Sequence, residues 1–220
     1  MMSMPVDGRD VEPFDVVDHL VVASNDLDQG VRSIRGLLGC GPGPGGRHPD
    51  WGTHNALLGL GGSTYLEVIA PDPESLLESA DRPAVFTKPG SGLINGWVAV
   101  HRDIPAALSV ADAMGHPLGA PINGRRSLPD GRELSWTLTD PHARHFDGLA
   151  PILIDWGHSP HPAASAPAGC RLVDFRLQHP DPGALTAFLG ALEVPVVVEQ
   201  GEVPLIMASI EGPNGLVTLT

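Results

Sequence analysis

The chain lacks several features that mark whole classes of protein. Among its 220 residues there is no apolar run long enough to cross a membrane, and the first ten residues hold no apolar signal-peptide segment. Its 13 Lys and Arg side chains against 26 Asp and Glu give a net charge of −13. Without a basic run, this balance argues against nucleic acid or an anionic membrane as a partner. The only two cysteines, Cys40 and Cys170, make no disulfide framework, so we expect two free thiols in the core or in loops and a cytoplasmic protein.

Familiar catalytic motifs are missing as well. The stretch from Gly43 to Gly46 lacks the Gly-Lys-Ser/Thr ending of a phosphate-binding loop, and no serine lies in a Gly-x-Ser-x-Gly motif. Two His-x-x-His spacings, His142/His145 and His158/His161, lie in irregular segments flanked by proline. Without a helix, this spacing fixes no common face, and we interpret all four as loop histidines rather than a zinc site.

What is abundant is turn-forming and apolar residues. The chain has 27 glycines and 23 prolines, scattered along its length, and 42% of its residues are hydrophobic. This composition is typical of a loop-rich globular protein with a sizeable core rather than a disordered chain.

An internal repeat organises the chain. Asp26, Asp103 and Asp181 recur at nearly equal intervals, and each is followed by an apolar stripe with helical spacing, so each is expected to cap a helix. Strands are expected around these helices over residues 14–23, 54–60, 64–70, 94–101, 118–123, 132–139, 151–156, 172–178, 195–199, 205–210 and 216–220, with one short irregular strand within 41–49.

This order predicts an α+β fold of tandem βαβββ units that form a cupped mixed sheet. The units cover residues 14–70 and 94–157 and together make one domain. The remaining boundaries are a flexible leader (1–13), linkers over 71–93 and 158–169, and a third βαβββ unit (170–220) packed on the same domain.

The most informative residues are His19 and Glu67. Each is a polar side chain within an apolar strand, and a carboxylate in such surroundings is costly unless it finds a partner. An imidazole, or a metal bound by both side chains, would supply that partner. The alternative is that the two only hydrogen-bond to each other inside the cup.

The motifs resemble the vicinal oxygen chelate superfamily, which includes glyoxalase I and extradiol dioxygenases, and more narrowly its bacterial glyoxalase-like domain proteins. The resemblance covers residues 15 to about 156 and rests on four stretches, Asp18-His19-Leu20-Val21-Val22-Ala23, Gly52-Thr53-His54-Asn55-Ala56-Leu57-Leu58, Tyr65-Leu66-Glu67-Val68-Ile69-Ala70 and Pro151-Ile152-Leu153-Ile154-Asp155-Trp156. It implies metal ligands on the first and last strand of each unit.

His19 and Glu67 match two of these metal-ligand positions, and Asp155 on the last strand of the second unit is a third. The first strand of that unit offers no His or Glu, so the resemblance implies one divalent metal (Zn, Ni, Mn or Fe) on at most three ligands, or none. His19 and Glu67 are also the candidate catalytic residues, because a carboxylate is a suitable base beside a bound substrate.

Further residues are candidates for contact with a small molecule. His54 and Arg132 occupy matching strand positions, and Trp97 and Trp136 could form an aromatic wall, although core packing or a strand edge explains each of them as well. Arg125 and Arg126 precede a turn, where they could clamp a carboxylate or simply be solvated.

Three functions stay open from the sequence. The first is a metal-dependent lyase, isomerase or dioxygenase that acts on a small oxygenated metabolite. The second is a metal-free protein on the same fold that binds a drug or metabolite, and a catalytically inactive dimerisation module is a third option. Because two units complete each other in this superfamily, an odd third unit also predicts a homodimer.

Overall fold

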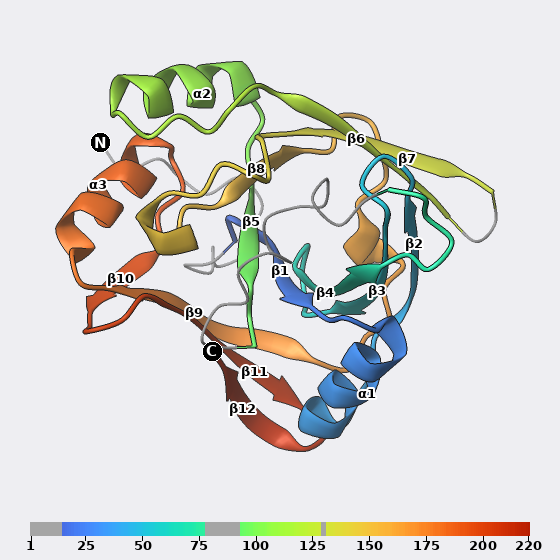
Figure 1. Cartoon of the computed structure of the whole chain (residues 1–220). Helices are drawn as coiled ribbons and strands as arrows, with labels where there is room; N and C mark the ends of the chain where they lie inside the picture. Colours follow the sequence, from blue (N-terminus) through green and yellow to red (C-terminus); the bar gives the residue numbers. More distant parts are fainter. Residues whose placement is uncertain (1–14, 78–92, 129–130) are drawn as a thin grey trace.

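In a computed structural model, residues 15–77, 93–128 and 131–220 are described. Eight strands close into a barrel in the order β1-β4-β3-β2-β6-β7-β8-β5, and a separate four-stranded sheet follows (Figure 1). The barrel strands are β1 (Val17–Ala23), β2 (Gly43–His48), β3 (Thr53–Gly59), β4 (Tyr65–Pro71), β5 (Gly96–Val100), β6 (Ile122–Ser127), β7 (Glu133–Leu138) and β8 (Ile152–Asp155). The predicted α+β class with a curled mixed sheet is confirmed.

The barrel joins two halves that have the same element order. Residues 17–71 run β1, α1 (Leu27–Leu38), β2, β3, β4, and residues 96–155 run β5, α2 (Ile104–Ala113), β6, β7, β8. Within each half the first strand pairs in parallel with the last. The halves meet where β1 pairs with β5, and where β2 touches β6 through the single pair Arg47 and Ser127.

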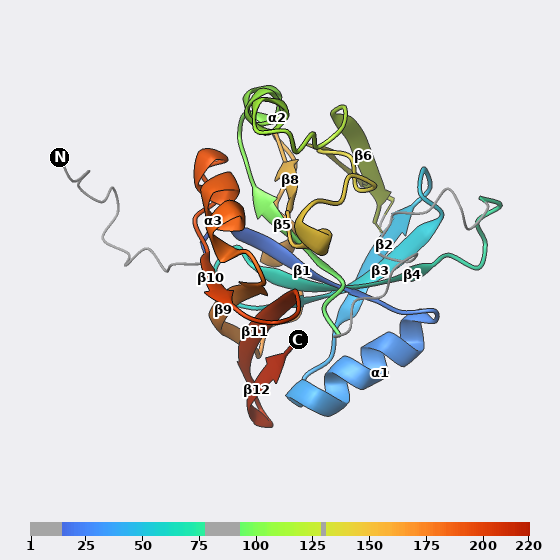
Figure 2. The same ribbon diagram turned by 60° about the vertical axis from the view of Figure 1, so that its left-hand side comes forward.

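The helices begin where the sequence predicts. The side chains of Asp26, Asp103 and Asp181 each accept a hydrogen bond from the backbone N–H three residues later, as N-cap residues do. Helix α1 ends at Gly39, whose φ of 80° suits a residue without a side chain. The helices α1 and α2 lie on opposite sides of the barrel strands (Figures 1 and 2).

The third unit keeps the element order of the first two but not their strand order. Its elements are β9 (Arg171–His179), α3 (Pro182–Ala191), β10 (Val197–Gln200), β11 (Leu205–Gly212) and β12 (Gly215–Leu219). Its first strand is central, in the order β10-β9-β11-β12, and pairs in parallel with the strand that follows α3 rather than with the last one. The sheet packs against the outside of the barrel, where Trp97 and Phe175 belong to one continuous core (Figure 2).

A disulfide ties this third unit to the first. Cys40, just after α1, is bonded to Cys170, just before β9. The expectation of two free thiols is therefore wrong for this structure. The pairing follows from tertiary packing, because β11 and β12 lie against α1 and bring the start of β9 to the end of that helix.

Other expectations are refined. The strand expected over 118–123 begins later, at Ile122, because Gly119 adopts a positive φ and Pro121 follows it. The predicted leader (1–13) and most of the linker at 71–93 lie outside the described residues. In the part of the chain that the structure describes, no helix is long and apolar enough to cross a membrane.

Candidate functional site

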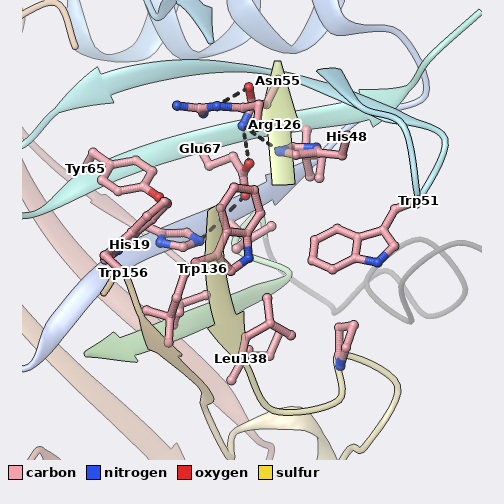
Figure 3. Close-up of a pocket in the computed structure, with 16 residues that line it drawn as sticks. His19, His48, Trp51, Asn55, Tyr65, Glu67, Arg126, Trp136, Leu138 and Trp156 are labelled. Atoms are coloured by element: carbon pink, nitrogen blue, oxygen red, sulfur yellow. Dashed lines mark hydrogen bonds and ion pairs between the residues drawn. The ribbon is translucent and has the colours of Figure 1, made fainter. Parts of the chain in front are cut away.

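The candidate site is a pocket inside the barrel. Its cavity measures about 70 Å³, room for a few water-sized groups. Strands β1 and β4 place His19, Val21, Tyr65, Glu67 and Ile69 along its wall, because alternate residues of a strand share a face. The remaining lining residues are His48, Trp51, Asn55, Val98, Arg126, Trp136, Leu138, Pro141, Ile152, Ile154 and Trp156. Figure 3 shows the polar side chains gathered on one side of this lining.

His19 and Glu67 face each other across the pocket wall. The Nε2 of His19 lies 3.7 Å from the Oε2 of Glu67, and both side chains are about nine-tenths buried (Figure 3). On the other side of the ring, Nδ1 of His19 lies 2.6 Å from the Oδ1 of Asp18. Since a carboxylate only accepts, Nδ1 carries a proton, and Nε2 is the ring atom turned toward Glu67.

Asp18 is a buried carboxylate with three donors. Besides His19, it accepts hydrogen bonds from the Nε1 of Trp156 at 2.9 Å and from the Nε2 of His161 at 3.0 Å. Burial by itself raises the pKa of Asp18, but the hydrogen bonds from His161 and His19 outweigh it and bring the pKa down to about 2. Asp18 is therefore ionised at neutral pH and holds the His19 ring in one orientation.

Asn55 is the second hydrogen-bonding centre. Its Nδ2 donates to the Oε1 of Glu67 at 2.5 Å and lies 3.4 Å from the Nε2 of His48. Its Oδ1 accepts from the backbone N–H of Gly46 at 2.9 Å and from the Nη1 of Arg126 at 3.4 Å. The side-chain amide thus stands between the carboxylate and the guanidinium.

Glycine makes this arrangement possible. A Cβ placed on Gly46 would lie 2.4 Å from the backbone oxygen of Ser127 and 2.7 Å from the side chain of Arg126, closer than real side chains approach. Strand β2 therefore needs a glycine here to come near β6 and to place Arg126 beside Asn55.

His48 and Tyr65 complete the polar wall. Burial lowers the pKa of His48 to about 4, although the nearby Glu67 opposes the shift, so this ring is neutral at pH 7. Its Nδ1 lies 2.9 Å from the hydroxyl of Thr53. The ring of Tyr65 stacks on His19 at 4.5 Å, and burial raises the pKa of its hydroxyl well above the usual value, which keeps it a donor.

The pocket brings together only part of the predicted set. Trp136 lines it beside His19 and Glu67. Three other predicted residues, His54, Trp97 and Asp155, each lie next to a pocket residue on the same strand. Because neighbouring residues of a strand point to opposite faces, Asn55, Val98 and Ile154 point into the pocket and the three predicted residues point outward.

The structure places these residues elsewhere. Trp97 is in the core, where its Nε1 donates to the oxygen of Leu149, and the carboxylate of Asp155 caps the N–H of Gly157. His54 faces the outer groove, and Arg132 precedes β7 on the surface. The triad of His19, Glu67 and Asp155 is therefore not assembled.

Several pocket residues were not predicted. His48 lies in a glycine-rich segment with no alternating pattern. Asn55 follows His54, which is titratable and is therefore the one of the two that the sequence predicts to be functional. The sequence pairs Arg126 with Arg125 as a possible hairpin clamp, yet the two point to opposite faces of β6. Among the four loop histidines, His161 reaches the site from behind, through Asp18.

Comparison with known proteins places the chain in a family. A model described as "Glyoxalase-like domain" matches residues 17–193. A hypothetical protein from Staphylococcus aureus has a similar structure, with a TM-score of 0.62 and 15% identity over 86% of both chains.

Shorter chains with a similar structure include a variant of methylmalonyl-CoA epimerase from Streptomyces coelicolor in complex with 2-nitronate-propionyl-CoA. It has 19% identity and a TM-score of 0.44, over 66% of this chain and 97% of the epimerase. A comparison with curated proteins found no match. The family model and the fold agree with the motifs, and the chain belongs to the glyoxalase-like domain family of the vicinal oxygen chelate superfamily.

Proposed function

We propose that the chain is an enzyme of the lyase or isomerase type that moves a proton on a small oxygenated molecule. Glu67 is the base that removes a proton from a carbon next to a carbonyl group, and His19 is its proton partner. The observation that carries this proposal is the buried pair of His19 Nε2 and Glu67 Oε2, 3.7 Å apart and facing one pocket.

The geometry of this pair places a base and a proton carrier side by side, with His19 Nε2 3.7 Å from Glu67 Oε2. A proton that the pair takes from a substrate can be held by either side chain. Because Asp18 holds the other ring nitrogen, that proton can move between His19 and Glu67 without a rotation of the ring.

The step balances within the pocket. The C–H bond breaks, its proton passes to an oxygen of Glu67, and the bonding electrons move through the new C=C bond to the carbonyl oxygen. The enolate oxygen that forms needs a hydrogen-bond donor, and the protonated hydroxyl of Tyr65 is one in the lining. Return of the proton to the opposite face of the carbon gives an isomer, and loss of a neighbouring leaving group gives a lyase reaction.

The residues present do not fit the metal site that the resemblance implies. His19 and Glu67 supply two donors, but the second half of the barrel offers Val98, Ile152 and Ile154 at the pocket wall. Among the described residues, no three His, Cys, Asp or Glu side chains are grouped so as to hold a metal ion. A catalytic zinc site uses three protein ligands. We therefore assign the proton transfer to side chains alone.

Hydrogen exchange tests the proposal. The protein in D₂O is mixed with hydroxyacetone, pyruvate or glyceraldehyde, and proton NMR follows the C–H signals next to the carbonyl group. We expect exchange that falls about 10²–10⁴-fold in Glu67→Gln, the usual contribution of a general base. Glu133→Gln is the matched control, because Glu133 is exposed on the outside of β7.

Two outcomes contradict this assignment. Exchange that is absent with all three compounds, or equal in wild type and Glu67→Gln, removes the proton-transfer function. Exchange that is abolished by EDTA and restored by Zn²⁺, Ni²⁺, Mn²⁺ or Fe²⁺ shows instead that the metal-dependent reaction is correct.

A metal-free binding protein is the second candidate, and the aromatic lining favours it. Trp51 and Trp156 are half-buried and line the pocket where it meets solvent, with Trp136 deeper inside. This candidate predicts that a bound ligand changes tryptophan fluorescence and raises the melting temperature but undergoes no exchange.

A further inference from the structure

Two neighbouring arginines on β6 have opposite surroundings. Arg125 is half-exposed, and its Nε and Nη2 donate to the two oxygens of Asp50 at 2.8 and 3.0 Å. Arg126 points into the barrel and is only 3% exposed. The first is a solvated ion pair, whereas the second is a cation placed at the wall of the pocket.

The inward arginine is incompletely paired. Its Nη1 donates one long hydrogen bond, 3.4 Å, to the neutral Oδ1 of Asn55, and its Nε has no partner among the described residues. The charge of Glu67 acts on Arg126 through space, but among the described residues the two side chains form no ion pair, and the amide of Asn55 bonds to both. Burial lowers the pKa of Arg126, yet arginine keeps its charge at neutral pH. A buried cation that no anion contacts is costly unless a ligand completes it.

A second unpaired donor lies nearby. Among the described residues, the Nε1 of Trp136 is buried without a partner, and it lies against Gly124, where a Cβ would come within 2.3 Å of it. Gly124 is two residues before Arg126 on the same face of β6, and its cross-strand partner is Trp136. On β6 and β7, the Nε of Arg126 and the Nε1 of Trp136 are thus two buried donors without an acceptor among the described residues, and both side chains line the pocket.

We propose that the substrate carries an anionic oxygen group, a carboxylate, which Arg126 binds with its guanidinium while Trp136 donates to the same end of the molecule. This inference rests on the proposed function in one respect, since it places that carboxylate in the pocket where Glu67 acts. A planar guanidinium matches the two oxygens of a carboxylate, and the cavity of about 70 Å³ admits a small organic acid or the acid end of a larger one.

Binding of a matched pair of probes tests this substrate class. Pyruvate and its neutral amide, pyruvamide, have the same shape and differ in charge, and the fluorescence of the pocket tryptophans reports their binding. We expect pyruvate to bind wild type at least tenfold more tightly than pyruvamide. In Arg126→Met this preference disappears, because pyruvate loses tenfold or more in affinity while pyruvamide changes little.

Two further variants keep the test decisive. Arg125→Met is the matched control on the next residue of the same strand, and we expect it to retain the full preference for pyruvate. Arg126→Lys keeps the charge but loses the fork, so an intermediate preference is expected, and this variant replaces Arg126→Met if the latter does not fold. Equal binding of pyruvate and pyruvamide by wild type, or an unchanged preference in both Arg126 variants, overturns the inference.

The experiments can contradict the anion site and the proton transfer independently of each other. Glu67→Gln is expected to bind pyruvate but to exchange its hydrogens about 10²–10⁴-fold more slowly than wild type. Arg126-dependent binding of pyruvate without any exchange in wild type would leave the anion site standing and remove the proposed reaction. If neutral hydroxyacetone exchanges as fast as pyruvate and Arg126→Met has no effect on pyruvate binding, the proposed reaction stands and the anion site is removed.

Discussion

The two halves of the barrel share an element order but line the pocket with different chemistry. The first half contributes His19, His48, Asn55 and Glu67, which bond to one another or to side chains behind them. The second half contributes mostly apolar side chains, with Arg126 as its charged residue. The apolar residues of its wall are Val98, Trp136, Leu138, Pro141, Ile152, Ile154 and Trp156.

This asymmetry indicates a division of labour within a duplicated architecture. Under the proposed function, the half with paired titratable groups supplies the reactive atoms, and the other half supplies a binding surface with one charge. The superfamily resemblance implies metal ligands from both halves, whereas the second half lines the pocket with Val98, Ile152 and Ile154. The contrast also predicts that only the first half makes folding stability depend on pH.

The largest effect is expected at His48. Its folded pKa of about 4 lies below the ordinary 6.5, so as pH falls from 6.5 to 4 the unfolded chain takes up a proton that the folded chain does not. The neutral His48 ring therefore contributes its full stability above pH 6.5, and the free energy of unfolding falls by about 3 kcal/mol by pH 4. In urea unfolding, we expect the free energy of unfolding of wild type to fall by this amount as pH falls, and that of His48→Gln to lack this fall. Parallel curves for the two proteins would contradict it.

A smaller effect is expected at Asp18. Its folded pKa of about 2 lies below the ordinary 3.8, so ionised Asp18 contributes about 2 kcal/mol of stability above pH 4, and the contribution disappears as pH falls toward 2. The difference in unfolding free energy between wild type and Asp18→Asn should therefore be largest near neutrality and narrow in acid. A difference that stays constant down to pH 2 would mean that the charge of Asp18 is not what stabilises the fold.

The smallest effect is expected in the second half. Ile154 is 2% exposed in the apolar cluster within the barrel, and Ile154→Val removes one methylene there. We expect a loss of about 1 kcal/mol. Because no titratable group changes, the loss should be the same at pH 7 and pH 4 in urea unfolding. A loss that varies with pH would show that the apolar wall is coupled to the polar one.

The sequence predicts the elements of this fold better than the direction of their side chains. Helix caps at Asp26, Asp103 and Asp181 are local features, and the structure confirms all three. The inward face of a strand is not local here. Most barrel strands are buried on both sides, by the pocket inside and by the core outside, so hydrophobic alternation does not tell the two faces apart.

The errors at the site follow from that ambiguity. His54 and Asp155 are the more conspicuous polar residues, but their neighbours Asn55 and Ile154 face the pocket. His19 and Glu67 both line the pocket, and they stand out in the sequence because each is a polar side chain within a mostly apolar strand. Arg126 and Arg125 could not be separated by sequence, since only the register of β6 decides which of them is buried.

The hydrogen-bond donors to Asp18 come from both ends of the barrel sequence. Asp18 and His19 are among the first residues of the barrel to be made, whereas Trp156 and His161 follow the last barrel strand. A nascent chain that ends at β8 holds both members of the His19–Glu67 pair but lacks two of the three groups that fix the carboxylate behind it. The hydrogen bonds that fix Asp18 are therefore complete only once residues 156–161 pack against β1, a strand more than a hundred residues earlier in the chain.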